Sequence, residues 1–157
     1  MAPHVHVLMA TWNGAAHLEE QLRSFQAQTH RDWSLWVSDD GSTDATGRML
    51  AGYAAAHPGR VHLFEGPRQG SAANFLSLLA QPDLPGGVVA LADQDDVWLP
   101  HRLERGLDWL VRGDGQDGGR PTVYASRTIR VTEALEPLSP SIDHPRPPVF
   151  ANALVQN

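Results

Sequence analysis

The sequence of 157 residues contains no cysteine. This absence excludes disulfide bonds and thiolate metal sites, and it argues against a small secreted scaffold held together by disulfides. A chain of this length can bury an adequate core without covalent cross-links and fits a single domain. We therefore expect residues 1–157 to form one domain.

Basic residues and long apolar runs are also scarce. Twelve basic residues, all of them arginines, stand against 18 aspartates and glutamates, which gives a net charge of −6 and argues against a nucleic-acid partner. No run approaches the roughly 18 apolar residues of a transmembrane helix, and residues 1–4 lack the features of a secretory signal. We expect a cytoplasmic protein without a transmembrane segment, and peripheral association with the inner face of the membrane stays open.

Three common phosphate and nucleophile motifs are missing. The absence of G-x-G-x-x-G after the first expected strand disfavours a Rossmann dinucleotide site, and the absence of G-x-x-x-x-G-K-[ST] excludes a P-loop. The absence of G-x-S-x-G disfavours an α/β-hydrolase.

Apolar runs typical of buried strands alternate with residues at helical spacing along most of the chain. This alternation predicts an α/β layered fold with a mainly parallel sheet. Strands are expected at residues 5–9, 33–38, 61–64 and 86–91, and helices at 15–28, after 44, at 72–81 and at 99–112. Beyond these, we expect a loop at 113–119, strands at 122–125 and 128–131, and an irregular Pro-rich loop at 133–148.

Polar side chains follow three of the expected strands directly. Asp93 and Asp95 are two residues apart, so in an extended segment they point the same way, and two like charges this close suit a divalent cation. The alternative is a polar turn that caps the next helix. Asp39 and Asp40 follow the second strand, where one acid can serve the local turn and the other a ligand.

Other side chains near these strand ends suit a nucleoside diphosphate. Trp12 offers a face for stacking a base, an Asp can accept a hydrogen bond from N3–H of uracil or thymine, and Arg68 before a helix suits phosphate oxygens. His4 and His6 could share a strand face and pair as metal ligands, but no third ligand at a suitable spacing is evident.

The order and the amino-acid sequences of these segments resemble the family 2 glycosyltransferases, which have the GT-A fold. The resemblance spans roughly residues 4 to 112, and residues 93–98, Asp-Gln-Asp-Asp-Val-Trp, look most like rhamnosyltransferases. The segments that carry the resemblance to the family are residues 5–14, 37–44, 68–75 and 92–104.

The resemblance implies a site that binds a UDP- or dTDP-sugar. Trp12 corresponds to the aromatic against the pyrimidine, Asp40 to the acid that reads the base and Arg68 to the loop arginine near the donor. Asp93 and Asp95 correspond to the Asp-x-Asp that holds Mg²⁺ or Mn²⁺, with Asp95 the first candidate for a direct ligand. The full expected donor-binding set is Thr11, Trp12, Asn13, Asp40, Arg68, Asp93 and Gln94.

The resemblance also implies transfer of the sugar, with inversion, to a glycan or lipid-linked acceptor in polysaccharide biosynthesis. The family's general base lies after a further strand, and no credible base is evident here; Asp143 is the first to test. We therefore expect a donor-binding domain that is incomplete at its C-terminus. The alternatives are a sugar nucleotidyltransferase and a non-catalytic nucleotide-binding fragment.

Overall fold

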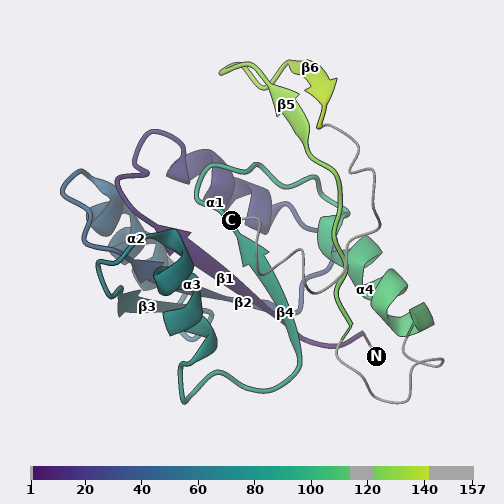
Figure 1. The fold of residues 1–157 in the computed structure, drawn as a ribbon, viewed down its shortest axis with the longest axis horizontal. Helices are drawn as coiled ribbons and strands as arrows, with labels where there is room; N and C mark the ends of the chain where they lie inside the picture. The colour runs from purple at the N-terminus through teal and green to yellow at the C-terminus, as the bar shows by residue number, and fades with distance from the viewer. Residues whose placement is uncertain (1, 114–121, 142–157) are drawn as a thin grey trace. The chain divides into compact units, whose positions relative to one another are not determined.

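A computed structural model of the protein describes residues 2–113 and 122–141. Four parallel strands form one sheet in the order β3-β2-β1-β4, and a helix follows each strand in the chain, which confirms the predicted α/β fold (Figure 1). In chain order the elements are β1 (Val5–Thr11), α1 (Leu18–Gln26), β2 (Trp33–Asp39), α2 (Thr46–Ala56), β3 (Val61–Glu65), α3 (Ser71–Leu79), β4 (Val88–Ala92) and α4 (Arg102–Gly113).

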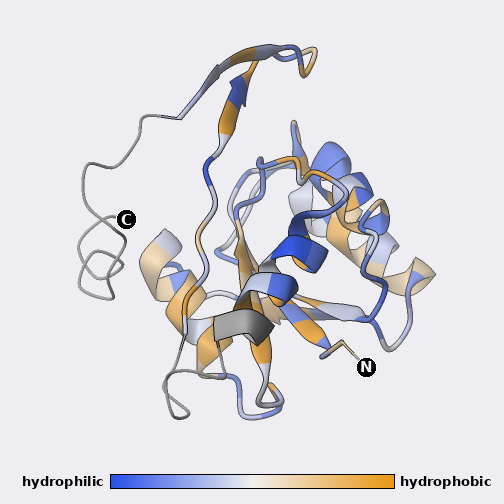
Figure 2. Ribbon diagram, turned by 90° about the vertical axis from the view of Figure 1, so that its right-hand side faces the viewer, coloured by the Kyte–Doolittle hydropathy of each residue, from blue (hydrophilic) through white to orange (hydrophobic). Residues whose placement is uncertain are grey.

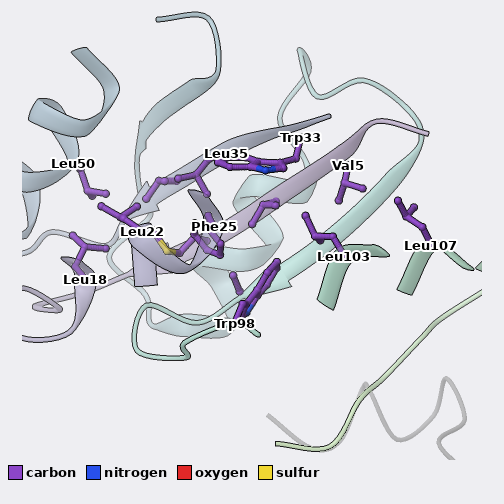
Figure 3. Packing of buried hydrophobic residues seen from close by; sticks show 14 residues of the cluster. Val5, Leu18, Leu22, Phe25, Trp33, Leu35, Leu50, Trp98, Leu103 and Leu107 are labelled. Carbon is purple, nitrogen blue, oxygen red and sulfur yellow. The ribbon is translucent and has the colours of Figure 1, made fainter. Parts of the chain in front are cut away.

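The main core lies on one face of this sheet. Strand β1 is buried at every position because it runs between β2 and β4. Its alternate residues Val5, Val7 and Met9 pack with apolar side chains of α1, α2 and α4 (Figure 3). Colouring by hydropathy shows the apolar residues of the sheet strands and of the helix faces (Figure 2).

The opposite face carries a smaller apolar cluster. Leu8 of β1 and Trp36 of β2 pack there with Leu78 of α3. Within residues 2–113 and 122–141, no helix combines the length and the apolar character that crossing a bilayer requires.

The chain divides into two compact units, Met1–Leu107 and Asp108–Asn157. The second contains a hairpin of β5 (Ile129–Val131) and β6 (Pro137–Pro140), so the interpretation of residues 133–148 as wholly irregular is wrong. Both strands of a two-stranded ribbon are edges, so the missing proline N–H groups at the ends of β6 are tolerated.

The strand predicted at residues 122–125 is also wrong. This segment has no regular secondary structure, and the ring of Tyr124 lies 5.7 Å from that of Trp109 on α4. An apolar stretch of four residues forms a strand only where it finds a partner strand, and here its aromatic side chain packs on a helix instead. The loop predicted at 113–119 lies outside the described residues from position 114 onward.

Candidate functional site

A cavity of about 630 Å³ opens at the carboxyl ends of β1, β2 and β4, beside the start of α3. Parallel α/β sheets bind ligands at this edge, and the volume lies within the range of small-molecule sites, about 300–1,000 Å³. The predicted residues that line it are Thr11, Trp12, Asp40, Arg68, Asp93, Gln94 and Asp95.

Trp12 presents its ring to solvent while its backbone is held in place. Its side chain is 61% exposed. Its N–H donates to Oε1 of Gln94 at 2.8 Å, and Nε2 of Gln94 donates to its carbonyl oxygen at 3.1 Å. An aromatic ring with a fixed backbone and an open face is suited to stacking against a planar ligand.

Asp40 ties the end of β2 to the loop that precedes α3. It is buried, and its Oδ1 accepts from the backbone N–H of Arg68 at 2.6 Å while its Oδ2 accepts from that of Gly70 at 2.8 Å. These bonds hold Arg68, whose φ of 58° lies in the left-handed region, at the rim of the cavity. Because each carboxylate oxygen accepts more than one hydrogen bond, Asp40 keeps capacity for a ligand donor.

Asp39 and Asn13 organise the neighbouring loops. Asp39 accepts hydrogen bonds from the hydroxyl of Thr11 and from the backbone N–H and hydroxyl of Ser42. Asn13 stands apart from the cavity lining: its Oδ1 accepts from the backbone N–H of Thr43 at 2.8 Å. The acid that serves the local turn is therefore Asp39, and a contact between Asn13 and a donor stays a prediction.

Asn74 of α3 is a lining residue that the sequence reasoning missed. It is buried, and its Nδ2 donates to the carbonyl oxygen of Ser38 at 2.9 Å. Its buried Oδ1 has no hydrogen-bond partner among the described residues. The signal that could have found it is an asparagine inside a mainly apolar helix, since buried amides require partners.

Asp93 and Asp95 gather negative charge at the cavity. Partial desolvation raises the pKa of the Asp93 carboxyl, and the carboxylates of Asp96 and Asp95 raise it further. No group of three or more histidine and acidic side chains is placed to hold a metal within residues 2–113 and 122–141. Two carboxylates that leave positions for phosphate oxygens and water do fit Mg²⁺ or Mn²⁺, because Mg²⁺ is usually bound in this way.

Two glutamines, Gln21 of α1 and Gln28 just after that helix, make hydrogen bonds to the segment that begins at Asp93. Nε2 of Gln21 donates to the carbonyl oxygen of Asp93 at 3.0 Å. Gln28 donates to the carbonyl oxygen of Leu99 at 3.0 Å and accepts from the N–H of Leu103 at 3.2 Å. The sequence reasoning missed both: Gln21 lies on the buried side of α1, and Gln28 is buried just beyond the end of that helix.

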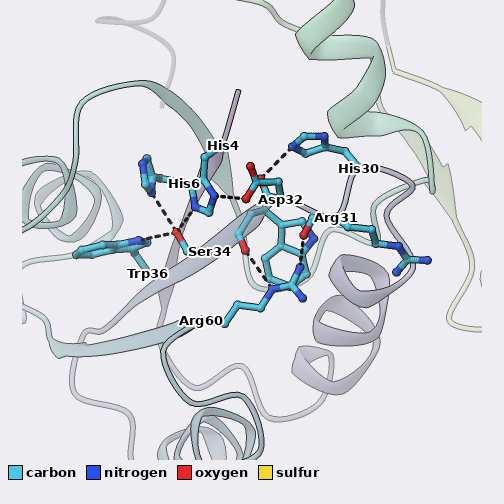
Figure 4. Close-up of polar contacts among 9 residues, drawn as sticks. His4, His6, His30, Arg31, Asp32, Ser34, Trp36 and Arg60 are labelled. Carbon is cyan, nitrogen blue, oxygen red and sulfur yellow. Dashed lines mark hydrogen bonds and ion pairs between the residues drawn. The ribbon is translucent and has the colours of Figure 1, made fainter. Parts of the chain in front are cut away.

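His4 and His6 lie at the opposite, amino end of the sheet strands. Ring nitrogens of both contact the hydroxyl oxygen of Ser34 at 3.0 Å, and His4 also contacts Asp32 at 2.6 Å (Figure 4). The same hydroxyl accepts from the indole N–H of Trp36 at 3.1 Å. This network occupies the histidines with protein partners.

Comparison with known proteins gives the family. The family model described as "Glycosyl transferase family 2" matches residues 6–146. The chain is 33% identical over 106 residues to the dTDP-rhamnosyl transferase RfbG of Shigella flexneri, covering 66% of this chain and 37% of that protein. It is 32% identical over 110 residues to the putative glycosyltransferase EpsE of Bacillus subtilis, covering 70% of this chain and 39% of that protein.

Solved structures share the fold. The mannosyltransferase PcManGT from Pyrobaculum calidifontis, in complex with GDP-Man and Mn²⁺, has a TM-score of 0.64 and 28% identity over 78% of this chain and 34% of its own. TarS 1-349 of S. aureus has a TM-score of 0.61 and 20% identity over 83% of this chain and 42% of its own. The chain therefore spans about two fifths or less of these proteins. It belongs to glycosyl transferase family 2 and has the GT-A fold of its structural neighbours.

Proposed function

We propose that this chain binds a UDP- or dTDP-linked sugar and takes part in transferring the sugar, with inversion, to a glycan or lipid-linked acceptor. The observation that carries the proposal is one cavity lined by an open tryptophan, a buried aspartate, an arginine and two acidic side chains. The name of the dTDP-rhamnosyl transferase relative supports a dTDP-sugar, and the neighbour bound to GDP-Man and Mn²⁺ supports a nucleotide-sugar and a divalent metal.

Each lining residue has a role in this proposal. The pyrimidine stacks on Trp12 and donates its N3–H to Asp40, and Arg68 neutralises phosphate charge. Asp93 and Asp95 hold Mg²⁺ or Mn²⁺ against the diphosphate. Without a cation, two bare charges 5 Å apart at an effective dielectric of about 20 repel by roughly 3 kcal/mol. A bound metal also stabilises the charge of the departing diphosphate.

Inversion requires a carboxylate that takes the proton of the acceptor hydroxyl as it attacks the anomeric carbon. The first candidate, Asp143, lies outside the described residues. Membership of family 2 favours sugar transfer over nucleotidyl transfer. A non-catalytic role in nucleotide binding is distinguished by a turnover assay with nucleotide-sugar and acceptor.

Isothermal titration calorimetry with UDP, dTDP and GDP, each with Mn²⁺ or EDTA, tests the proposal. We expect the pyrimidine nucleotides to bind more tightly than GDP, and each of them to bind more tightly with Mn²⁺ than in EDTA. Asp95→Asn should abolish the Mn²⁺ effect, whereas Asp96→Asn, which removes a neighbouring charge outside the cavity lining, should retain it. Equal affinity in EDTA, or tighter binding of GDP, contradicts the proposal.

A further inference from the structure

We infer that Gln94 is a positioning residue that couples the two halves of the cavity, so that metal binding at the acidic pair and base stacking on Trp12 reinforce each other. The inference rests on the proposed function and goes beyond it. It reassigns Gln94 from direct contact with the donor to the support of another residue.

The contact is a reciprocal pair of hydrogen bonds between residues 82 positions apart in the sequence. Oε1 of Gln94 accepts from the N–H of Trp12 at 2.8 Å, and its Nε2 donates to the carbonyl oxygen of Trp12 at 3.1 Å. The parallel pairing of β1 with β4 ends at Met9 and Ala92. The amide of Gln94 therefore joins the two chains beyond the last paired residues of the sheet.

The fit of this amide depends on Gly14. A Cβ atom at position 14 would lie 2.3 Å from Oε1 and 2.5 Å from Cδ of Gln94, and its three nearest neighbours all belong to that side chain. The φ of Gly14 lies outside the left-handed region, so the backbone itself would accept alanine. A methyl group at this position therefore has to displace the amide of Gln94 from its present place.

The position of Gln94 in the chain supplies the coupling. It lies between Asp93 and Asp95, both of which line the cavity, so an ion that fixes these carboxylates also fixes the residue between them. Its amide then holds the backbone of Trp12, whose ring is otherwise open to solvent. Ordering one half of the cavity lowers the entropy cost of ordering the other.

The reciprocal hydrogen bonds between Gln94 and Trp12 form a clamp. A double-mutant cycle based on a steric clash tests this clamp without any ligand. Gly14→Ala should lower the thermal unfolding midpoint in the parent protein, because the new methyl group displaces Gln94. In a Gln94→Ala background the obstructing atoms are gone, so the same Gly14→Ala change should cause a much smaller shift. Equal shifts in the two backgrounds overturn the clamp.

A binding cycle tests the coupling. The quantity compared is the affinity for UDP with Mn²⁺ divided by that without, in the parent, in Gln94→Ala and in Gln94→Met, which nearly keeps the size and the neutral charge but makes neither hydrogen bond to Trp12. We expect this ratio to fall about fivefold or more in both variants, as for typical coupling between sites. An unchanged ratio overturns the coupling. A parent without any Mn²⁺ effect overturns the proposed function and the coupling together, and the steric cycle then decides alone whether the clamp exists.

Discussion

Two adjacent aspartates, Asp39 and Asp40, show how neighbouring residues of the same type receive different tasks. Asp39 accepts from Thr11 and Ser42 and fixes the turn after β2. Asp40 is buried, borders the cavity and organises the loop that carries Arg68. The direction of each side chain at the end of the strand, which alternates along the chain, separates a structural acid from one that can meet a ligand.

Trp12→Ala should weaken the binding of UDP or dTDP by about tenfold or more, because a base stacked on an aromatic ring contributes about 1–3 kcal/mol. Titration calorimetry in the presence of Mn²⁺ measures the change. The matched control is Trp109→Ala, since Trp109 is 48% exposed and Trp12 is 61% exposed. The stacking role is refuted if both variants lose the same affinity or neither loses any.

At the scale of elements, α1 positions the acidic segment as well as covering the sheet. Its apolar residues Leu18, Leu22 and Phe25 are buried in the main core. Phe25 packs edge-on against Trp98, with ring centroids 4.9 Å apart, and this contact anchors the segment that follows Asp95. Gln21 of α1 and Gln28, just beyond its end, add hydrogen bonds to residues 93 and 99, so α1 and the residues that follow it fix this segment through both apolar and polar contacts.

Gln28→Leu should lower the free energy of unfolding by about 1–3 kcal/mol, because it leaves a buried N–H without its partner. This group is the N–H of Leu103; the carbonyl of Leu99 also loses the Gln28 amide but still accepts from the N–H of Arg102. Urea unfolding followed by circular dichroism measures the loss. Gln26→Leu makes the same chemical change at an exposed position and should cost less; equal costs would show that the buried bonds contribute nothing.

The sequence was sufficient to predict the elements of the parallel sheet, because the apolar runs and helical spacings of residues 5–112 are local signals. The convergence of Trp12, Asp40 and Asp93 on one cavity was also predictable, since parallel strands end at the same edge. The role of Gln94 was not predictable, because its partner is the backbone of Trp12, which lies 82 positions away in the sequence. The β6 strand was missed because its prolines are typical of loops, and only pairing with β5 reveals it.

In the unit that contains the sheet, polar residues concentrate at both ends of the strands and serve different purposes. The carboxyl end carries the candidate site, and the amino end carries the network of His4, His6 and Ser34. His62 stacks on Trp36 in the same region, with ring centroids 4.3 Å apart. Ligand binding and the part of the pH dependence of stability that comes from His6 should therefore depend on opposite ends of the sheet.

His6 is expected to make the stability of the protein fall in mild acid. Burial lowers the pKa of the His6 imidazole, and the nearby His4 and His62 lower it further; Asp32 and Asp83 are the acidic groups near this network. The unfolded chain therefore takes up the proton at a higher pH, near 6.5, than the folded protein does. The contribution of His6 is complete above about pH 6.5 and is lost as the pH falls towards the lowered folded value.

His6→Gln removes this titrating group, so the free energy of unfolding should fall less steeply between about pH 6.5 and 5 than in the parent. Urea unfolding at a series of pH values measures the slope. At pH 8 the imidazole of His6 is neutral in both the folded and the unfolded parent protein. The difference in the free energy of unfolding between parent and variant at this pH therefore reports the packing change alone. Nucleotide affinity at pH 8 should be unchanged, since position 6 lies at the opposite end of β1 from the cavity. Parallel pH profiles would show that protonation of His6 does not destabilise the fold, and a loss of nucleotide affinity would show that the two ends of the sheet are coupled.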